Sequence, residues 1–338
     1  MSEQRTILIT GAGGFLGRLL AETLLKDPQT IDARLVLVDI VAPKAPQGAN
    51  AIAVKADLTD PSQADGLFQT SYGVPDIVYC LHGIMSRGAE DNFDLGLKVN
   101  FDAVRSVLES ARRFGTNTSQ PLKFIFASSL AVYGGSLPNV VTPDTIATPQ
   151  GAYGAEKLMC EILINEYTRR GFVDGRILRL PTIVVRPGPP AAATSSFLSG
   201  IIREPLKGVP TTCPIGNSLS SPELDLAVWI ASPETTIQNF LNAARIPSSS
   251  FMLHSRVVCL PGITVTVREE LEALEKVGGK EALRLVEFQD DETNRRIVSS
   301  WPARFDNGYA LSLGFLVDEG GMAPIVERFK KVVAAGLA

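Results

Sequence analysis

Short runs of consecutive apolar residues alternate along the first half of the chain with longer segments that are apolar on one face only. The runs are rich in β-branched residues and predict buried strands at residues 6–10, 35–38, 51–54, 77–81, 124–127 and 176–180. The longer segments repeat apolar side chains at helical spacing and predict helices at residues 15–25, 99–114 and 153–169. Strands that are apolar throughout and alternate with helices indicate a parallel sheet covered on both faces. We therefore expect a Rossmann-type, doubly wound α/β domain over residues 1–185.

The pattern changes after Pro181. Residues 186–196 are mostly prolines and small residues and predict a loop. Residues 266–269 have capping-box spacing and open a helix that is expected to end at residues 278–279. Residues 186–338 are thus expected to form a smaller, less regular substrate-binding lobe, from which some segments return to the first domain.

Composition narrows the class of protein. Of the 338 residues, 45% are hydrophobic and 20% are charged, which suits a folded core and excludes general disorder. The chain has 32 Lys and Arg residues and 36 Asp and Glu residues, and the resulting net charge of −4 argues against nucleic acid as a partner. We find no uncharged apolar run of about 18 residues, so no membrane partner is expected.

The cysteines and histidines are too dispersed for a zinc site. Cys80, Cys160, Cys213 and Cys259 form no CxxC pair and the chain has only two histidines, so no metal is expected. Cysteines spread in this way predict buried thiols of a reducing compartment rather than disulfides. The N-terminal residues lack the apolar stretch of a signal peptide, and together these features predict a cytoplasmic protein.

A glycine-rich loop follows the first predicted strand. Gly11 can make the tight turn, Gly14 can leave room for a pyrophosphate, and Gly17 can allow close helix–strand packing. Phe15 and Leu16 open the helix that would present its N-terminal amides to the phosphates. Because the loop joins a strand to a helix, it indicates a dinucleotide site rather than a flexible turn.

An aspartate ends the second predicted strand, 22 residues after Gly17. The carboxylate of this Asp39 can accept hydrogen bonds from both hydroxyls of the adenosine ribose and would repel a 2′-phosphate, which favours NAD over NADP. The structural alternative is an ordinary turn aspartate. Asp57 and Leu58 follow the third strand and could hold the adenine amine and ring face, although an aspartate there is also a common helix cap.

Four polar residues form a candidate catalytic set. Tyr153 and Lys157 are four residues apart at the start of a helix, so they share one face, and the cation can lower the pKa of the phenol for proton transfer. Ser129 follows the fifth strand and could bridge the substrate oxygen and the Tyr153 hydroxyl. Asn100 opens the preceding long helix and could hold a relay water. A packing tyrosine and a solvated lysine are the alternative interpretation of the YxxxK spacing.

As a group, these motifs resemble the extended short-chain dehydrogenase/reductases of the NAD-dependent epimerase/dehydratase superfamily. The residues that carry the resemblance are 10–17, 57–58, 128–134 and 153–157. The resemblance implies NAD as cofactor, a homodimer, and a catalytic triad of Ser129, Tyr153 and Lys157 that Asn100 supports. It further implies cofactor contacts, partly through the backbone, from Leu81, His82, Gly83, Asn100, Tyr153, Lys157, Pro181 and Ile183.

A narrower resemblance extends into the second half of the chain. Residues 80–86, 180–188, 195–206 and 300–305 are similar to D-erythronate dehydrogenase-like proteins, a family that oxidises the 2-hydroxyl of a small sugar acid with NAD. A carboxylate substrate requires a cationic partner, for which Arg186 and Arg203 are the candidates, with a surface or helix-end arginine as the alternative in each case. Further candidates for substrate contacts are Ser86, Ser129, Tyr153, Thr182 and Ser196.

The leading hypothesis is an NAD-dependent oxidoreductase of carbohydrate metabolism that acts on the hydroxyl or ketone of a small polar substrate. A nucleotide-sugar epimerase or dehydratase would use the same triad, but the residues after Leu180 depart from the pattern of those enzymes. Reduction of a bulkier ketone in specialised metabolism is a third possibility. A non-catalytic NAD-sensing regulator is the fourth, and it is disfavoured because such proteins usually lack the Tyr/Lys pair.

Overall fold

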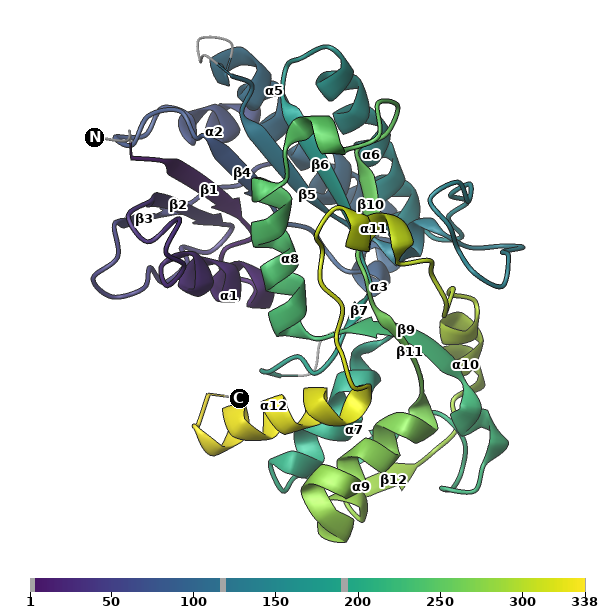
Figure 1. Cartoon of the computed structure of the whole chain (residues 1–338). Helices are drawn as coiled ribbons and strands as arrows, with labels where there is room; N and C mark the ends of the chain where they lie inside the picture. The colour runs from purple at the N-terminus through teal and green to yellow at the C-terminus, as the bar shows by residue number, and fades with distance from the viewer. Residues whose placement is uncertain (1–3, 116–119, 190–193, 338) are drawn as a thin grey trace. The chain divides into compact units, whose positions relative to one another are not determined.

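A seven-stranded sheet lies at the centre of the first of two compact units in the computed structural model, which describes residues 4–115, 120–189 and 194–337. The strands follow the order β10-β6-β5-β4-β1-β2-β3, and the pairs β1–β2, β2–β3, β1–β4 and β4–β5 are parallel (Figure 1). The strand order reverses between β1 and β4, as in Rossmann folds, and the predicted fold class is confirmed. The strands are β1 (Thr6–Thr10), β2 (Arg34–Asp39), β3 (Ala51–Lys55), β4 (Ile77–Cys80), β5 (Lys123–Ser129), β6 (Asp174–Leu180) and β10 (Val257–Cys259).

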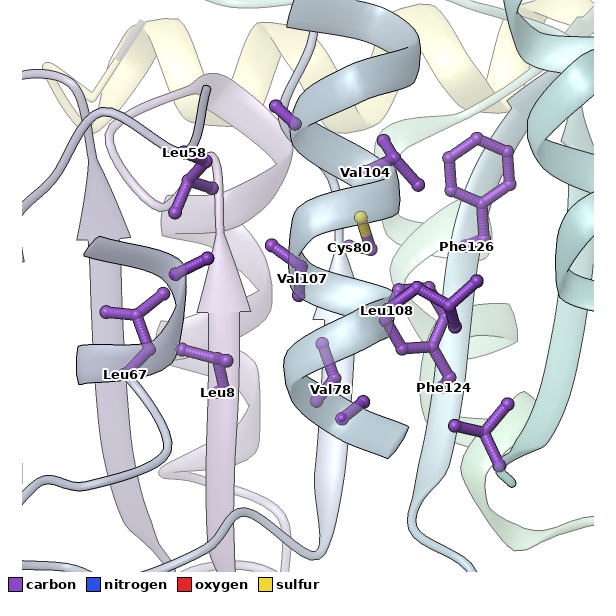
Figure 2. Close-up of a cluster of buried hydrophobic side chains, with 14 of the residues drawn as sticks. Leu8, Leu58, Leu67, Val78, Cys80, Val104, Val107, Leu108, Phe124 and Phe126 are labelled. Carbon is purple, nitrogen blue, oxygen red and sulfur yellow. The ribbon is translucent and has the colours of Figure 1, made fainter. Parts of the chain in front are cut away.

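Helices cover this sheet because its strands are apolar on both faces. They are α1 (Phe15–Leu24), α2 (Pro61–Gly66), α3 (Ser86–Asp91), α4 (Phe93–Gly96), α5 (Ala103–Gly115), α6 (Ala152–Arg169) and α8 (Pro233–Arg245). On one face, Leu8, Val78 and Phe124 of the strands pack against Val104 and Leu108 of α5 (Figure 2). All five side chains are completely buried, so this contact supplies much of the hydrophobic stabilisation of the first unit.

The predicted helix at residues 99–114 is wrong at its start. Residues Leu97–Asp102 form a π-helical turn, η1, and the regular helix α5 begins only at Ala103. Turns of this kind occur inside helices, frequently at functional sites, and hydrophobic periodicity does not reveal them. Asn100, expected to open the helix, lies inside η1 instead.

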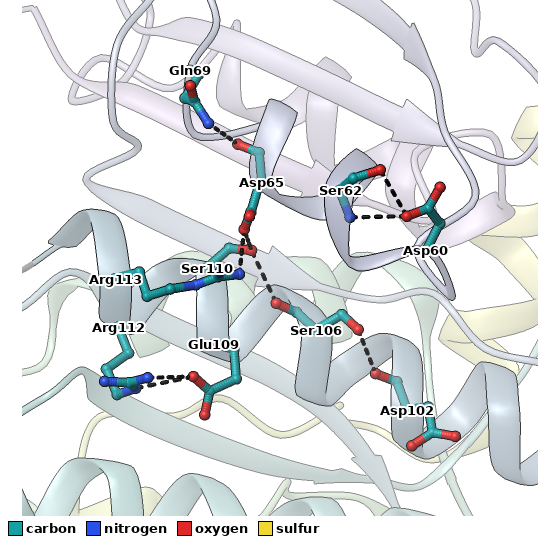
Figure 3. A network of polar contacts seen from close by, with 10 residues as sticks. All are labelled: Asp60, Ser62, Asp65, Gln69, Asp102, Ser106, Glu109, Ser110, Arg112 and Arg113. Carbon is teal, nitrogen blue, oxygen red and sulfur yellow. Dashed lines mark hydrogen bonds and ion pairs between the residues drawn. The ribbon is translucent and has the colours of Figure 1, made fainter.

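A polar network ties α2 to α5 (Figure 3). One carboxylate oxygen of Asp65 accepts hydrogen bonds from the Ser110 hydroxyl at 2.6 Å and from the Arg113 guanidinium at 2.5 Å. At the start of α2, the Asp60 side chain caps the helix by accepting from the Ser62 amide at 2.9 Å. These contacts hold the segment between β3 and α2, which carries the expected adenine-binding residues.

The two units interleave along the sequence. The first contains Met1–Val132, Gly151–Arg179 and Ile237–Val258, and the second contains the remaining residues. The seventh strand β10 and most of α8 therefore join the first unit from a late part of the chain. The division into an NAD-binding domain of residues 1–185 and a substrate-binding lobe of residues 186–338 stays a prediction.

The second unit has two small sheets and its own core. Its strands are β7 (Thr182–Ile183), β9 (Ala227–Ala231) and β11 (Ile263–Thr266) in one sheet, and β8 (Thr211–Cys213) and β12 (Val286–Phe288) in the other. Its helices are α7 (Ser196–Leu206), α9 (Val267–Leu283), α10 (Glu292–Ser299), α11 (Gly308–Ser312) and α12 (Met322–Ala334). Residues 190–193 of the expected loop lie outside the described residues.

The capping box of α9 is confirmed, and the first helical stretch of α9 ends at the glycine pair 278–279, as predicted. Thr266 and Glu269 exchange both capping hydrogen bonds. The helical run continues to Leu283, with a kink at Gly279, whose φ of 81° lies in the left-handed region. A glycine tolerates this backbone without a steric penalty, so the first helical stretch ends at the pair and a second, short one follows it.

The cysteines are thiols in the structure. Cys80, Cys160 and Cys213 are buried as predicted, whereas Cys259 is partly exposed. Burial raises the pKa of the Cys213 thiol to about 11, which keeps it protonated and unreactive at neutral pH. Within the described part of the chain, no helix has the length and apolar character needed to cross a membrane.

Candidate active site

The glycine loop after β1 has a backbone that only glycine can form. Gly11 has a φ of 70°, and a Cβ atom there would lie 2.8 Å from the backbone nitrogen of His82. A Cβ atom on Gly17 would lie 2.3 Å from the carbonyl oxygen of Gly11. Helix α1 begins directly after Gly14 without a side-chain cap, so its first amides are open to an anion. This cradle fits the pyrophosphate of a dinucleotide.

Asp39 lies against the glycine loop. Its carboxylate accepts hydrogen bonds from the Gly13 amide at 2.9 Å and from the Ile40 amide at 2.7 Å. The structure thus brings together the loop and the acidic residue that the sequence singled out. The contact of Asp39 with a ribose stays a prediction.

The residues at the expected adenine site differ in exposure. Asp57 is partly exposed, and hydrogen bonds from the Thr59 hydroxyl and amide, at 2.7 and 3.0 Å, lower the pKa of its carboxyl. Leu58 is 7% exposed and its side chain packs into the core (Figure 2). Only the small exposed part of its side chain and its backbone could therefore make the predicted contact with the adenine ring face.

A loop after β4 faces the glycine loop across the point where the strand order reverses. Its Leu81 amide donates to the Thr10 hydroxyl at 3.1 Å, and that hydroxyl lies 2.7 Å from Nδ1 of His82. Burial lowers the pKa of His82 to about 3, so the imidazole is neutral. Its Nε2 atom is enclosed and has no hydrogen-bond partner among the described residues. Dinucleotides bind at such a reversal, which suits the predicted cofactor contacts of this loop.

The three predicted catalytic residues all lie in the first unit. Ser129 ends β5, and its hydroxyl accepts a hydrogen bond from the Ala131 amide at 3.1 Å. Tyr153 and Lys157 stand on the first turns of α6, with Tyr153 partly exposed and Lys157 only 3% exposed. The Lys157 ammonium donates to the carbonyl of Ala127, two residues before Ser129, at 3.0 Å.

Aromatic rings surround the Lys157 ammonium. Its Nζ atom lies 4.7 Å from the centroid of the Phe126 ring and 5.6 Å from the centroid of the Tyr153 ring. Both distances are within the range of cation–π attraction. The lysine is thus held in a single place between β5 and the phenol of Tyr153, and it is not the solvated lysine of the alternative interpretation.

Asn100 is completely buried, and protein groups already occupy its side chain. Its Oδ1 atom accepts from the Ile84 amide at 2.8 Å, and its Nδ2 atom donates to the Ile84 carbonyl at 3.1 Å and to Glu156 at 2.7 Å. The Cys160 thiol donates to its main-chain carbonyl at 3.2 Å. Its expected role with a relay water stays a prediction, and in this structure the residue acts as a clamp.

A buried ionic cluster supports the end of β5, and sequence reasoning missed it. Glu161 of α6 accepts from the Ser128 hydroxyl at 2.5 Å and from Arg179 of β6, whose closest approach is 2.6 Å. All three residues are at least 90% buried. The cluster fixes the backbone next to Ser129. A glutamate on a helix looks solvent-exposed in the pattern of apolar residues, so that pattern does not predict its burial. The YxxxK motif, which lies on the same helix, is the nearest signal in the sequence.

The other substrate candidates do not share one unit. Ser86 begins α3 in the first unit, whereas Thr182, Arg186, Ser196 and Arg203 belong to the second. In that unit Pro181 precedes β7, which contains Thr182 and Ile183. Contacts of these residues with a substrate or with NAD stay predictions.

Arg203 is 2% exposed, and its guanidinium is engaged by the protein. It donates to one carboxylate oxygen of Glu204, at 2.5 and 2.9 Å, and to the carbonyl of Arg186 at 2.9 Å. Buried arginines with such partners hold structure, so Arg203 is a weaker candidate for a substrate carboxylate than it was from the sequence. This last contact places the Arg203 side chain beside the backbone of Arg186.

A surface hollow of about 780 Å³ lies in the second unit beside these residues. Helix α7 and the strand β8 form its walls, and Ser196, Arg203 and Lys207 are among its lining residues. Its lining also includes Glu204, which pairs with Arg203, so Lys207 is the lining cation outside that ion pair. Lys207 was not singled out from the sequence, because a lysine after a helix is usually a solvated end.

Comparison with known proteins relates these features to a family. Residues 7–220 match the model of the NAD dependent epimerase/dehydratase family. D-erythronate dehydrogenase from Haemophilus influenzae is 42% identical over 325 residues, which cover 96% of this chain and 98% of that protein. D-erythronate dehydrogenase from Cupriavidus necator is 44% identical over 319 residues, which cover 92% and 94%. The crystal structure of a nucleoside-diphosphate-sugar epimerase from Agrobacterium tumefaciens is 33% identical, with a TM-score of 0.87 over 98% of this chain and 94% of that one.

Proposed function

Because this chain belongs to the NAD dependent epimerase/dehydratase family, we propose that it oxidises the hydroxyl next to the carboxylate of D-erythronate or of a closely similar sugar acid. Family membership confirms the predicted extended short-chain dehydrogenase/reductase type, the NAD cofactor and the oxidoreductase class. The observation that carries the choice of substrate is the identity of 42–44% to two D-erythronate dehydrogenases over nearly their full lengths.

The proposed chemistry divides the work among residues of the first unit. Tyr153 accepts the proton of the substrate hydroxyl, and the Ser129 hydroxyl orients the same oxygen by a hydrogen bond. The ammonium of Lys157, held by the Ala127 carbonyl and the aromatic rings, places a positive charge beside the phenol ring that takes the proton. When bound, NAD supplies the hydride acceptor. The glycine loop, Asp39 and the loop after β4 would hold it.

The substrate carboxylate needs a cationic partner, because an unpaired charge in a pocket costs several kcal/mol. The two candidates for this role are Arg186 and Arg203, and the guanidinium of Arg203 also binds Glu204 and the Arg186 carbonyl. Arg186→Met should raise KM for the acid about ten-fold, in line with a hydrogen bond to a charged group. The affinity for NAD should not change. Arg284→Met, at a residue whose side chain is 71% exposed, is the matched control.

The decisive experiment is a turnover assay with NAD and separate samples of D-erythronate, other aldonates, neutral ketones with reduced cofactor, and nucleotide sugars. Reduced NAD should accumulate with D-erythronate and not with its nucleotide-sugar counterparts. Tyr153→Phe provides the background rate. No turnover of any sugar acid would contradict the proposal.

A second candidate function has one observation in its favour. The solved structure described above, with 33% identity, is that of a nucleoside-diphosphate-sugar epimerase. Such an enzyme would interconvert two nucleotide sugars without net production of reduced NAD. The nucleotide-sugar samples of the same assay, analysed by chromatography, separate the two functions.

We also propose a homodimer formed through α4 and α6. Apolar side chains of these neighbouring helices are exposed, with Phe93 at 59%, Leu95 at 46% and Ile162 at 64% exposure, which suits an interface. Ile162→Glu should give monomers in analytical ultracentrifugation. Ile146→Glu, at an isoleucine elsewhere that is 79% exposed, should leave the dimer intact.

The expected compartment and pathway complete the proposal. Buried thiols at Cys80, Cys160 and Cys213 suit a compartment that keeps cysteines reduced, which supports a cytoplasmic location. Fractionation of cells would test it. A sugar-acid substrate places the reaction in carbohydrate metabolism.

A further inference from the structure

A carboxylate is buried beneath the π-helical turn η1. Glu156 of α6 is 1% exposed, and its Oε2 atom accepts a hydrogen bond from Asn100 Nδ2 at 2.7 Å. Its Oε1 atom has no hydrogen-bond partner among the described residues. A Cβ atom on Gly96 would lie 2.5 Å from Oε1, so a glycine at this position leaves the room that the carboxylate occupies.

Such a group lowers the stability of a folded protein. A buried carboxylate with an unpaired oxygen costs free energy that an apolar side chain of similar size would not cost. We therefore look for a role of this carboxylate in the group that it binds, which is the side-chain amide of Asn100.

Glu156 determines which way the Asn100 amide faces. Its Oε2 atom accepts from Asn100 Nδ2, so the NH2 end of the amide lies on the side of Glu156. The oxygen end then faces the Ile84 amide, from which it accepts at 2.8 Å, while the second N–H of Nδ2 donates to the Ile84 carbonyl. A rotated amide would place Oδ1 against the carboxylate and lose these bonds. Glu156 thus locks a two-sided clamp on the backbone of Ile84.

The clamped segment lies where the cofactor is expected. Ile84 directly follows Leu81, His82 and Gly83, in the loop after β4, and a Cβ atom on Gly83 would lie only 2.7 Å from Asn100 Oδ1. This loop and the glycine loop after β1 flank the reversal of strand order, where doubly wound folds bind dinucleotides. A wall that is already in position lowers the cost of ordering it on binding.

We propose that Glu156 is a positioning residue for NAD, which acts through Asn100 on the backbone of residues 81–84. The proposal rests on the proposed function only in assigning this loop to the cofactor. In this proposal Glu156 does not contact NAD. It changes the affinity of the protein for NAD rather than the rate of proton transfer.

The test measures NAD affinity without substrate, by isothermal titration calorimetry of the full-length chain below its melting transition. Glu156→Ala should raise the Kd for NAD about ten-fold. Glu156→Gln should raise it about three-fold, because a carboxamide can still accept from Asn100 but no longer excludes the rotated amide. Glu166→Ala is the matched control on the same helix, where the Glu166 side chain forms ion pairs with Arg169 and Arg170 at the surface, and it should leave the Kd unchanged.

A double-mutant cycle distinguishes an effect of Glu156 that acts through Asn100 from a general loss of structure. If Glu156 acts through Asn100, Glu156→Ala should add little to the loss in Asn100→Ala. Additive losses, or a Kd within two-fold of wild type for both Glu156 variants, would overturn the proposal even if the melting temperature falls. Failure of D-erythronate turnover with these effects on Kd intact would refute the substrate and leave the role of Glu156 standing.

Discussion

A second buried carboxyl group, in the core of the second unit, should make that unit less stable as the pH rises. Glu270 of α9 is completely buried, and neither of its oxygens has a hydrogen-bond partner among the described residues. Burial raises the pKa of this carboxyl well above its usual value. The folded chain therefore keeps a proton that the unfolded chain, with a glutamate pKa of about 4.3, has already lost.

The sign follows from this difference in proton binding. Below pH of about 4 both states carry the proton, and the full stability is present. Above it the unfolded state is favoured, and each pH unit up to the folded pKa removes about 1.4 kcal/mol of unfolding free energy. For a domain of roughly 150 residues this corresponds to about 3–6 °C in melting temperature per pH unit.

Glu270→Gln removes the titration and keeps the size and the buried polar atoms. Near pH 5 the variant and the wild type should melt within a few degrees of each other, and the variant should gain steadily over the wild type as the pH rises. Differential scanning calorimetry from pH 5 to 8 measures the difference. Glu272→Gln, at an exposed position of the same helix, is the control and should show no gain. The reasoning would be refuted if the melting temperatures of wild type and Glu270→Gln changed with pH in parallel.

Three further outcomes test the site. Tyr153→Phe should lower kcat about 10²–10⁴-fold with an unchanged Kd for NAD, and retention of a tenth of the activity would remove Tyr153 as the proton acceptor. Asp39→Ala combined with Ile40→Arg should move kcat/KM toward NADP; equal use of NADP by the wild type would contradict the role of Asp39. Arg203→Met should cost about 3 kcal/mol of unfolding free energy in denaturant titration, because Glu204 loses its partner, and an unchanged midpoint would show that the pair is dispensable.

The first half of the chain could be predicted because its signals are local. Strand β1 is buried along its whole length, and an apolar run bounded by a glycine turn has few other interpretations. Ser129, Tyr153 and Lys157 lie on β5 and α6, a strand and a helix that the apolar pattern predicted. The fold class followed from the alternation alone, without knowledge of any contact.

The short strands and the buried polar residues could not be predicted, because they depend on contacts between distant parts of the chain. Strands β8 and β10 are three residues long, too short for a period, and each exists because a partner strand supplies its hydrogen bonds. The buried face of α6 includes Glu156, Lys157 and Glu161, so its polarity resembles that of a solvated face. The engagement of Arg203 by Glu204 and by a carbonyl 17 residues earlier is equally invisible in a linear sequence.

The late arrival of β10 has a consequence for biosynthesis. Strand β6 has β5 on one side and β10 on the other, and β10 is encoded almost 80 residues after β6 ends. A nascent chain that has emerged only as far as α7 therefore exposes an unpaired strand edge, which can recruit other chains. Sheet closure has to wait until residue 259 has left the ribosome, so we expect that truncations before β10 aggregate and that chaperones engage the nascent protein in this interval.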